Sequence, residues 1–160
     1  NAIETLVNAK RVEFYAFGGS APVAMDGQHK FFRLKIPSSY ISDPHLQFMS
    51  ANSLERDDVV VAISQSGTTT ALIESVKIVR KNGAKVIGIM PGETPLANIC
   101  DFPLTINVGI NNRISKPVTS RIAYTAVIDV LTMGVAQLKP EAQDHLYNIA
   151  DSQRSLKIDN

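Results

Sequence analysis

The sequence has one cysteine, no tryptophan and no long hydrophobic run. Cys100 has no second cysteine with which to form a disulfide or a cysteine-based zinc site, which fits a reducing compartment. No stretch approaches 18 uncharged apolar residues, and the start has no basic segment followed by an apolar core. We therefore expect a soluble domain in the cytoplasm.

An excess of charge of either sign is also lacking. The 16 basic and 15 acidic residues give a net charge of +1 and are dispersed, so no nucleic-acid stripe or membrane-surface patch is expected. Two nucleotide-binding motifs are absent as well. Phe17–Val23 does not supply the G-x-G-x-x-G spacing of a dinucleotide site, and the P-loop lysine signature is missing. We expect neither a cofactor nor a metal.

The chain does contain strands and helices in alternation. Its 160 residues, 44% of them hydrophobic, suit one compact domain. Alternation with short connections predicts a three-layer α/β/α sandwich, with a doubly wound parallel sheet of five strands in a flavodoxin-like or Rossmann-like topology. The expected strands are 11–17, 38–41, 59–63, 85–90 and 103–108, and the longer helices are 23–34, 44–52, 71–81, 119–138 and one after Pro140. Asp43 is an expected helix N-cap and Asn82-Gly83 an expected helix end. A short helix is expected at 96–100 and a polar, irregular stretch at 109–116.

One strand-to-helix turn is rich in hydroxyl groups. The continuous apolar run Val59–Ile63 predicts a strand buried on both faces, and a helix follows from Ala71. At such a helix N-terminus, unpaired backbone N–H groups and the helix dipole favour a phosphate. Helix capping alone would need a single hydroxyl, so we interpret this turn as an anion cradle. It comprises Ser64, Gln65, Ser66, Gly67, Thr68 and Thr69.

A second strand-to-helix turn carries another hydroxyl. Ser20 follows Gly19 at an expected helix N-cap, and Pro22 suits the first helical turn. In doubly wound folds, ligands bind beyond the carboxyl ends of the strands where the strand order reverses. We therefore expect the two turns to lie side by side and to form one pocket.

These turns resemble those of a known family. Ser64-Gln65-Ser66-Gly67-Thr68-Thr69 after a buried strand, Gly19-Ser20 after the first strand and a later Val118-Thr119-Ser120 are together similar to the sugar isomerase (SIS) domain, a phosphosugar-binding module. Segments 28–34, 42–47, 118–123 and 127–131 resemble more narrowly the C-terminal half of RpiR-type transcription regulators, and within these the hexose-metabolism repressors.

The resemblance implies a ligand site and a regulatory role. Its ligand would contact Gly19, Ser20, Ser64, Gln65, Ser66, Gly67, Thr68, Thr69, Val118 and Ser120. It would be a phosphorylated sugar or sugar acid, such as 2-keto-3-deoxy-6-phosphogluconate. The chain starts at Asn1 without methionine, and we expect an N-terminal helix-turn-helix domain, absent here, to make any DNA contact. A dimer or tetramer is expected. The apolar faces of the helices at 119–138 and 142–156 are candidate subunit contacts, and the alternative for both is burial in the core of the domain itself, which is equally favoured for the first of them.

Two alternatives to a sensor remain open, a phosphosugar isomerase and an interaction module with a vestigial pocket. An isomerase needs a positioned base, and Arg33 stands where the resemblance leads us to expect the catalytic glutamate. Asp26, His29 and His45 are the remaining candidates for such a base. Lys30, Arg33 and Arg121 are instead candidates for pairing with a sugar-acid carboxylate.

Overall fold

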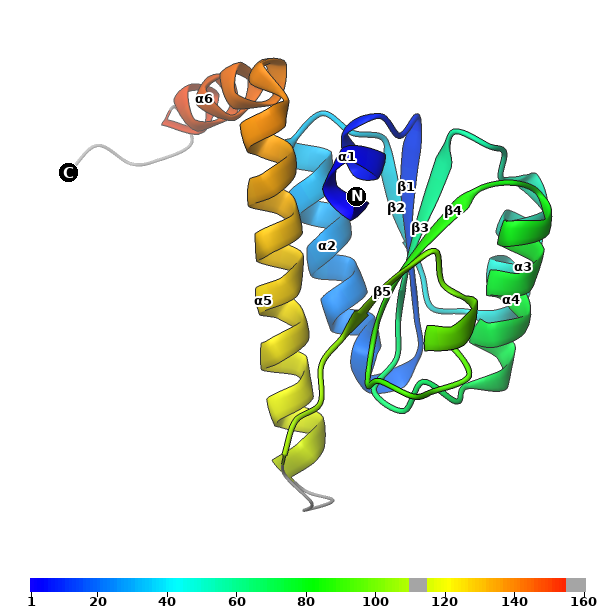
Figure 1. Ribbon diagram of the computed structural model, residues 1–160. Coiled ribbons are helices and arrows are strands. Elements are labelled where there is room, and N and C mark those ends of the chain that lie inside the picture. The colour runs from blue at the N-terminus through cyan, green and yellow to red at the C-terminus, as the bar shows by residue number, and fades with distance from the viewer. Residues whose placement is uncertain (110–114, 155–160) are drawn as a thin grey trace.

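The computed structural model describes residues 1–109 and 115–154; residues 110–114 and 155–160 lie outside it. A five-stranded parallel sheet lies between two layers of helices (Figure 1). The strands are β1 (Arg11–Ala16), β2 (Ser38–Ile41), β3 (Asp58–Ile63), β4 (Lys85–Met90) and β5 (Phe102–Thr105). The α-helices are α1 (Ala2–Val7), α2 (Ala21–Arg33), α3 (Pro44–Ser53), α4 (Thr70–Lys81), α5 (Ser115–Leu138) and α6 (Pro140–Arg154), with short 3-10 turns η1 (Gly18–Ser20) and η2 (Ala97–Ile99). The doubly wound α/β fold is confirmed.

The sheet has the order β2-β1-β3-β4-β5, with every pair parallel. The chain first moves outward from β1 to β2 and then crosses back to β3, so the order reverses between β1 and β3. Every residue of β3 is buried, as its uninterrupted apolar run predicts for a strand covered on both faces. The reversal point of the sheet therefore lies at its centre.

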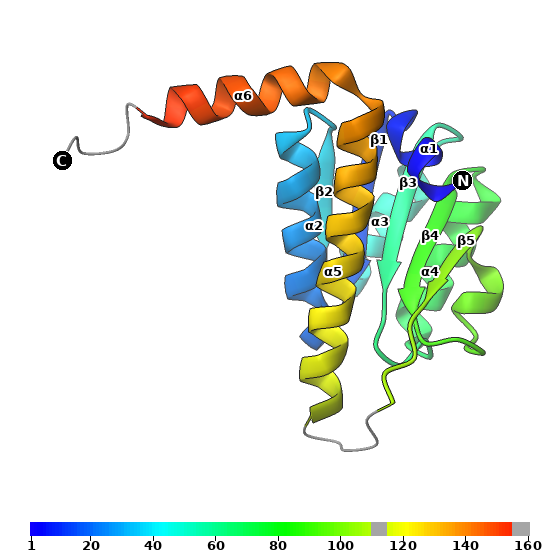
Figure 2. The same ribbon diagram turned by 60° about the vertical axis from the view of Figure 1, so that its left-hand side comes forward.

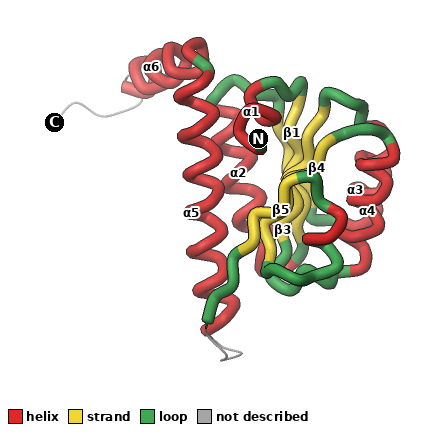
Figure 3. Tube along the Cα trace, viewed as in Figure 1, coloured by secondary structure: helices red, strands yellow, loops and turns green. Residues whose placement is uncertain are grey.

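Two hydrophobic cores flank the sheet, because alternate strand residues point to opposite faces. Helices α1, α2 and α5 cover one face, where Phe14, Val61 and Ile87 lie in the core. Helices α3 and α4 cover the other, where Tyr15 and Val60 are buried (Figures 2 and 3). The sheet and its two helical layers hold the strand ends in fixed relation to one another.

Several local signals in the sequence act as expected. The Asp43 carboxylate accepts a hydrogen bond of 2.9 Å from the backbone N–H of Leu46 and so caps α3. Gly83 follows the end of α4 with φ of +88°, a left-handed conformation that glycine adopts without strain.

Several predicted elements differ from the structure, most of them by one or two residues at an end. Helix α5 begins at Ser115 rather than Thr119, since Pro117 is tolerated in a first helical turn, where its missing N–H is not needed. Strand β5 ends at Thr105 rather than Val108, because its neighbour β4 ends at the paired Met90. The helix expected at 96–100 is only the η2 turn. Part of the polar stretch expected at 109–116, and the end of the helix expected at 142–156, lie outside the described residues.

Helices α5 and α6 carry much exposed apolar surface. By length and composition alone, Pro117–Leu138 is apolar enough to span a membrane, although Arg121 and Asp129 interrupt it; a single such helix is weak evidence of a membrane span. Only 28% of its most apolar stretch is buried, and α6 projects away from the sheet beyond α2 (Figure 2). The outer side of α5 is therefore a large apolar face without a partner among the described residues of this chain. The exposed large apolar side chains of α5 are Val118, Ile122, Val130, Met133 and Leu138.

Candidate functional site

The turns that follow β1 and β3 lie side by side at the reversal point of the sheet. Ala16 pairs with Ile63 at the ends of these strands, so the chain leaves both strands at the same edge. Helices α2, α4 and α5 all begin at this end of the molecule, which is the lower end in Figure 1. The prediction that the two hydroxyl-bearing turns meet is confirmed, and three helix N-termini add positive dipole ends around them.

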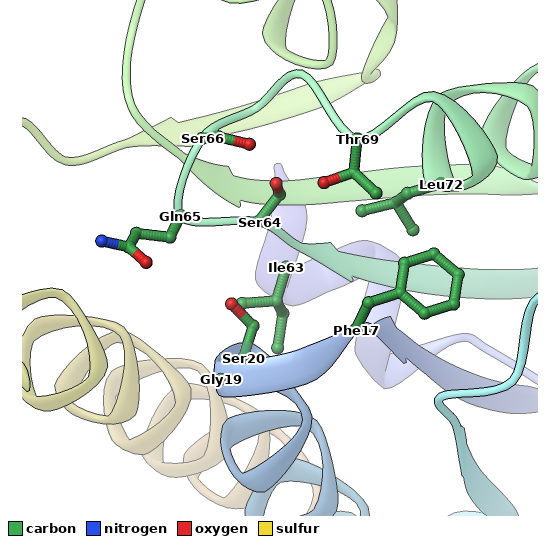
Figure 4. A pocket seen from close by; sticks show the side chains of 9 residues that line it. All are labelled: Phe17, Gly19, Ser20, Ile63, Ser64, Gln65, Ser66, Thr69 and Leu72. Atoms are coloured by element: carbon green, nitrogen blue, oxygen red, sulfur yellow. The ribbon is translucent and has the colours of Figure 1, made fainter. Parts of the chain in front are cut away.

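A cavity of about 180 Å³ occupies this junction. In Figure 4 the hydroxyl oxygens of Ser64, Ser66 and Thr69 point toward a common space, and Ser20 faces them from the end of β1. No charged side chain of the described chain lines this cavity. Its lining among the described residues is Phe17, Gly19, Ser20, Ile63, Ser64, Gln65, Ser66, Thr69 and Leu72.

Hydrogen bonds within the β3–α4 turn hold its shape. The Ser64 backbone N–H donates to the Ile89 carbonyl at 3.0 Å, which extends the sheet by one bond. The Ser64 hydroxyl oxygen accepts from the Gly67 N–H at 3.0 Å, and the Ser66 hydroxyl oxygen accepts from the Thr68 N–H at 3.2 Å. These hydrogen bonds within the protein fix the conformation of the turn.

Two hydroxyls at helix starts are not used for capping. Ser20 and Thr69 occupy the N-cap positions of α2 and α4, yet neither side chain makes a capping hydrogen bond. The prediction that Ser20 stands at an N-cap is confirmed for its position. Because these hydroxyls line the cavity without serving their helices, both can donate to an anion placed there.

A second cavity of about 130 Å³ adjoins the first and shares Gly19, Ser20 and Gln65 with it. Its far wall is the start of α5, and the Gln65 amide points toward that side in Figure 4. The residues that this wall contributes are Pro117, Ser120, Arg121 and Tyr124.

The sequence-predicted ligand residues fall into two groups. Seven line one or both cavities, and Gly67, Thr68 and Val118 line neither. The Thr68 hydroxyl instead donates to that of Ser66 at 3.0 Å, and Gly67 is buried behind the turn.

Sequence reasoning missed some of the lining residues, namely Phe17, Ile63, Leu72, Pro117 and Tyr124. Helical spacing could have found two of them. Leu72 is three residues after Thr69 and Tyr124 is four after Ser120, so each lies on the same helix face as a predicted residue.

The candidate bases lie outside both cavities. Asp26 forms an ion pair of 2.6 Å with Lys30, which also pairs with Asp129. His29 and His45 are exposed on α2 and α3. Arg33 lines a separate hollow between α2, α5 and α6. Among the described residues, no cluster of three His, Cys, Asp or Glu side chains could hold a metal ion.

Fold and cavity thus define a doubly wound α/β domain with a hydroxyl-lined pocket at its switch point. The family profile described as "SIS domain" matches residues 5–134. The chain therefore belongs to the SIS domain family, as its motifs suggested.

Curated relatives point to regulators of the HexR type. The chain is 38% identical over 152 residues to the HTH-type transcriptional regulator HexR of Pseudomonas aeruginosa, covering 94% of this chain and 53% of the relative. It is 36% identical over 159 residues to HexR of Escherichia coli, covering 99% and 55%. The Bifunctional protein glk of Burkholderia orbicola is 40% identical over 136 residues, covering 85% of this chain and 21% of that protein. The chain thus spans about half the length of the HexR relatives.

Solved structures share the fold. The Vibrio vulnificus NanR protein complexed with ManNAc-6P superposes with a TM-score of 0.89 at 21% identity, covering 98% of this chain and 60% of that one. The sugar isomerase domain of an RpiR transcription factor from Sphaerobacter thermophilus gives 0.79 at 20% identity, covering 94% and 83%. The resemblance to RpiR-type effector domains, made from the motifs, is confirmed.

Proposed function

We propose that this domain binds a phosphorylated sugar or sugar acid, with the phosphate in the turn between β3 and α4. The observation that carries this proposal is the convergence of the Ser64, Ser66 and Thr69 hydroxyls on one cavity at the N-terminus of α4. A hydrogen bond to a charged group contributes about 1.5–3 kcal/mol, so a few such donors hold a phosphate without a lysine. The fold that the domain shares with NanR in complex with a phosphosugar supports this choice of ligand.

We propose further that the domain senses this ligand without converting it. An aldose–ketose isomerase needs a carboxylate or imidazole beside the carbons that exchange a proton. Among the described residues, neither cavity is lined by Asp, Glu or His. Asp26, the acidic candidate, is held in an ion pair with Lys30. The HexR relatives, which are named as transcriptional regulators, also favour a sensor.

In the proposed whole protein, an N-terminal helix-turn-helix domain makes the DNA contacts and this domain reports the effector from the cytoplasm. The candidate effector is 2-keto-3-deoxy-6-phosphogluconate. Binding shifts the regulator between two states only to the extent that the ligand prefers one of them. We propose that these states are arrangements of a homodimer or a higher oligomer of this chain.

The proposed subunit contact is the outer side of α5. A predominantly apolar helix is normally buried, whereas Ile122, Val130 and Met133 of α5 are more than half exposed. Contiguous exposed apolar surface of this kind marks interaction sites. A two-fold axis would bring the same stripe from two copies together and bury both.

Calorimetric titration against a panel of phosphosugars and phosphorylated sugar acids tests the binding proposal, with NMR of the same samples for conversion. We expect binding without product. Product formation would make the domain an isomerase or lyase, and no heat with any member of the panel would count against a phosphosugar site.

A further inference from the structure

The second cavity differs in chemistry from the first. The first is lined by hydroxyl groups, an amide and apolar side chains, all uncharged. The second cavity shares Gly19, Ser20 and Gln65 with the first, and it is also lined by the charged residue Arg121. A ligand that fills both cavities therefore meets two chemically distinct ends.

Arg121 is the one charged residue that lines either cavity within the described chain. No described carboxylate pairs with it, whereas Lys30 on the neighbouring helix is held by Asp26 and Asp129. An arginine that faces a cavity without a partner is available to a ligand anion. Its planar fork matches the two oxygens of a carboxylate.

Ser120 adds an independent sign of a ligand. Ser120 is 2% exposed, and its hydroxyl has no hydrogen-bond partner in the described structure. Buried hydroxyls are normally satisfied, because an unpaired one costs about 1–3 kcal/mol. Ser120 lies next to Arg121 in the wall of the same cavity. A ligand oxygen there would satisfy this hydroxyl.

The surroundings favour an anion over a neutral group. Tyr124 lines this cavity, and its phenol can donate a hydrogen bond to a ligand. The N-termini of α2 and α5 lie at this end of the molecule. No acidic side chain of the described residues lines the cavity. The local field therefore attracts a second negative charge.

We propose that this second cavity is a carboxylate subsite, in which Arg121 and Ser120 bind the carboxylate of the ligand. The pocket then prefers phosphorylated sugar acids to neutral sugar phosphates. The inference rests on the proposed function, with the phosphate held by Ser64, Ser66 and Thr69. It adds that Arg121 decides which member of the phosphosugar class binds.

A matched pair of open-chain ligands tests this proposal. 6-Phosphogluconate and sorbitol 6-phosphate differ at carbon 1, where one bears a carboxylate and the other a hydroxymethyl group. Calorimetry should give at least a tenfold lower Kd for 6-phosphogluconate with the unmodified domain. Arg121→Gln should remove that preference and leave the Kd of sorbitol 6-phosphate within about twofold. The control Arg33→Gln, an exposed arginine outside both cavities, should leave both Kd values unchanged.

Equal Kd values for the two ligands in the unmodified domain would overturn the carboxylate subsite. An equal loss of affinity for both ligands in Arg121→Gln would also overturn it, because the arginine would then be binding the phosphate. If Ser64→Ala weakens the binding of either ligand while Arg121→Gln changes neither Kd, the phosphate site is supported and the carboxylate subsite is contradicted. Binding of neither ligand would count against the phosphate site and the subsite together. Thermal melting of each variant shows that its fold is intact.

Discussion

Thr94 packs directly against the α-carbon of Gly67 in the β3–α4 turn. A methyl group added to Gly67 would lie 2.3 Å from the Thr94 Oγ1 atom. Gly67 also has a φ of +64°, and its carbonyl accepts from the Leu96 N–H at 3.0 Å. The loop after β4 therefore supports the turn from behind, and only glycine fits between them.

Gly67→Ala should destabilise the domain by about 2–5 kcal/mol, since left-handed strain and overpacking both contribute. Gly83→Ala is the matched control. Gly83 has a φ of +88°, but its nearest neighbours, in Arg56, would lie 3.9 Å from the added methyl group. Gly83→Ala should be destabilised by left-handed backbone strain alone, by about 1–2 kcal/mol. Urea denaturation measures both, and equal losses would show that the Thr94 contact has no effect.

Ser20→Ala and Ser64→Ala should each weaken ligand binding by about 1–3 kcal/mol, but only one should alter stability. Ser64 accepts from the buried Gly67 N–H, so its loss should also cost about 1 kcal/mol of folding free energy. Ser20 caps nothing, so Ser20→Ala should melt like the unmodified protein. Calorimetry and thermal melting separate the two effects. Unchanged affinity in both variants would remove the proposed site.

Val130→Glu should dissociate the proposed oligomer, because it places a charge on the outer stripe of α5, where Val130 is 64% exposed. The variant should elute with a scattering mass near the chain's 17.4 kDa and keep its circular dichroism. Met49→Glu, at a 68% exposed position on α3 in the opposite layer, is the control and should stay oligomeric. A monomeric unmodified domain at high micromolar concentration would contradict the α5 contact.

Cys100 should react slowly with thiol reagents. Burial, together with the nearby Asp101 charge, raises the pKa of its thiol to about 12, so at pH 8 roughly one molecule in ten thousand carries the reactive thiolate. Absorbance with Ellman's reagent measures the rate, which should approach that of a free thiol only after unfolding. A rate in the native protein close to that of a free thiol would contradict the burial.

The same raised pKa gives Cys100 an alkaline effect on stability. Ionisation favours the unfolded chain, so the Cys100 contribution is complete below pH 9 and is lost as the pH rises toward 12. The difference in unfolding free energy between the unmodified protein and Cys100→Ala should therefore shrink at high pH. This difference cancels the effects of the tyrosines, which titrate in the same range. A difference that does not change between pH 8 and 11 would contradict the assignment.

Much of the fold follows from local sequence. The all-apolar run of β3, the Asp43 cap and the Asn82-Gly83 ending each act over a few residues, so pattern alone predicts them. The early start of α5 at Ser115 was missed, because a proline near a helix start suits both a loop and a first helical turn.

Buried charge could not be anticipated from the pattern of apolar residues. Glu13 lies in the middle of β1 and is buried, yet its carboxylate accepts hydrogen bonds from Tyr15 and from Ser50 of α3. Ser50 lies 37 residues away in the chain. A buried carboxylate is tolerated only when such partners surround it, and only the packed structure supplies them.

The sequence by itself determined that this is a doubly wound α/β domain of the SIS family with a hydroxyl-rich turn at a helix start. Only the tertiary structure decided that Ser20, Ser64 and Ser120 line two adjoining cavities and that Arg121 lines one of them. It also decided that Thr94 packs against the turn at Gly67. The physical reason is range. Helix caps and the burial pattern of a single strand depend on neighbours along the chain, whereas strand order and helix packing bring together residues far apart in sequence.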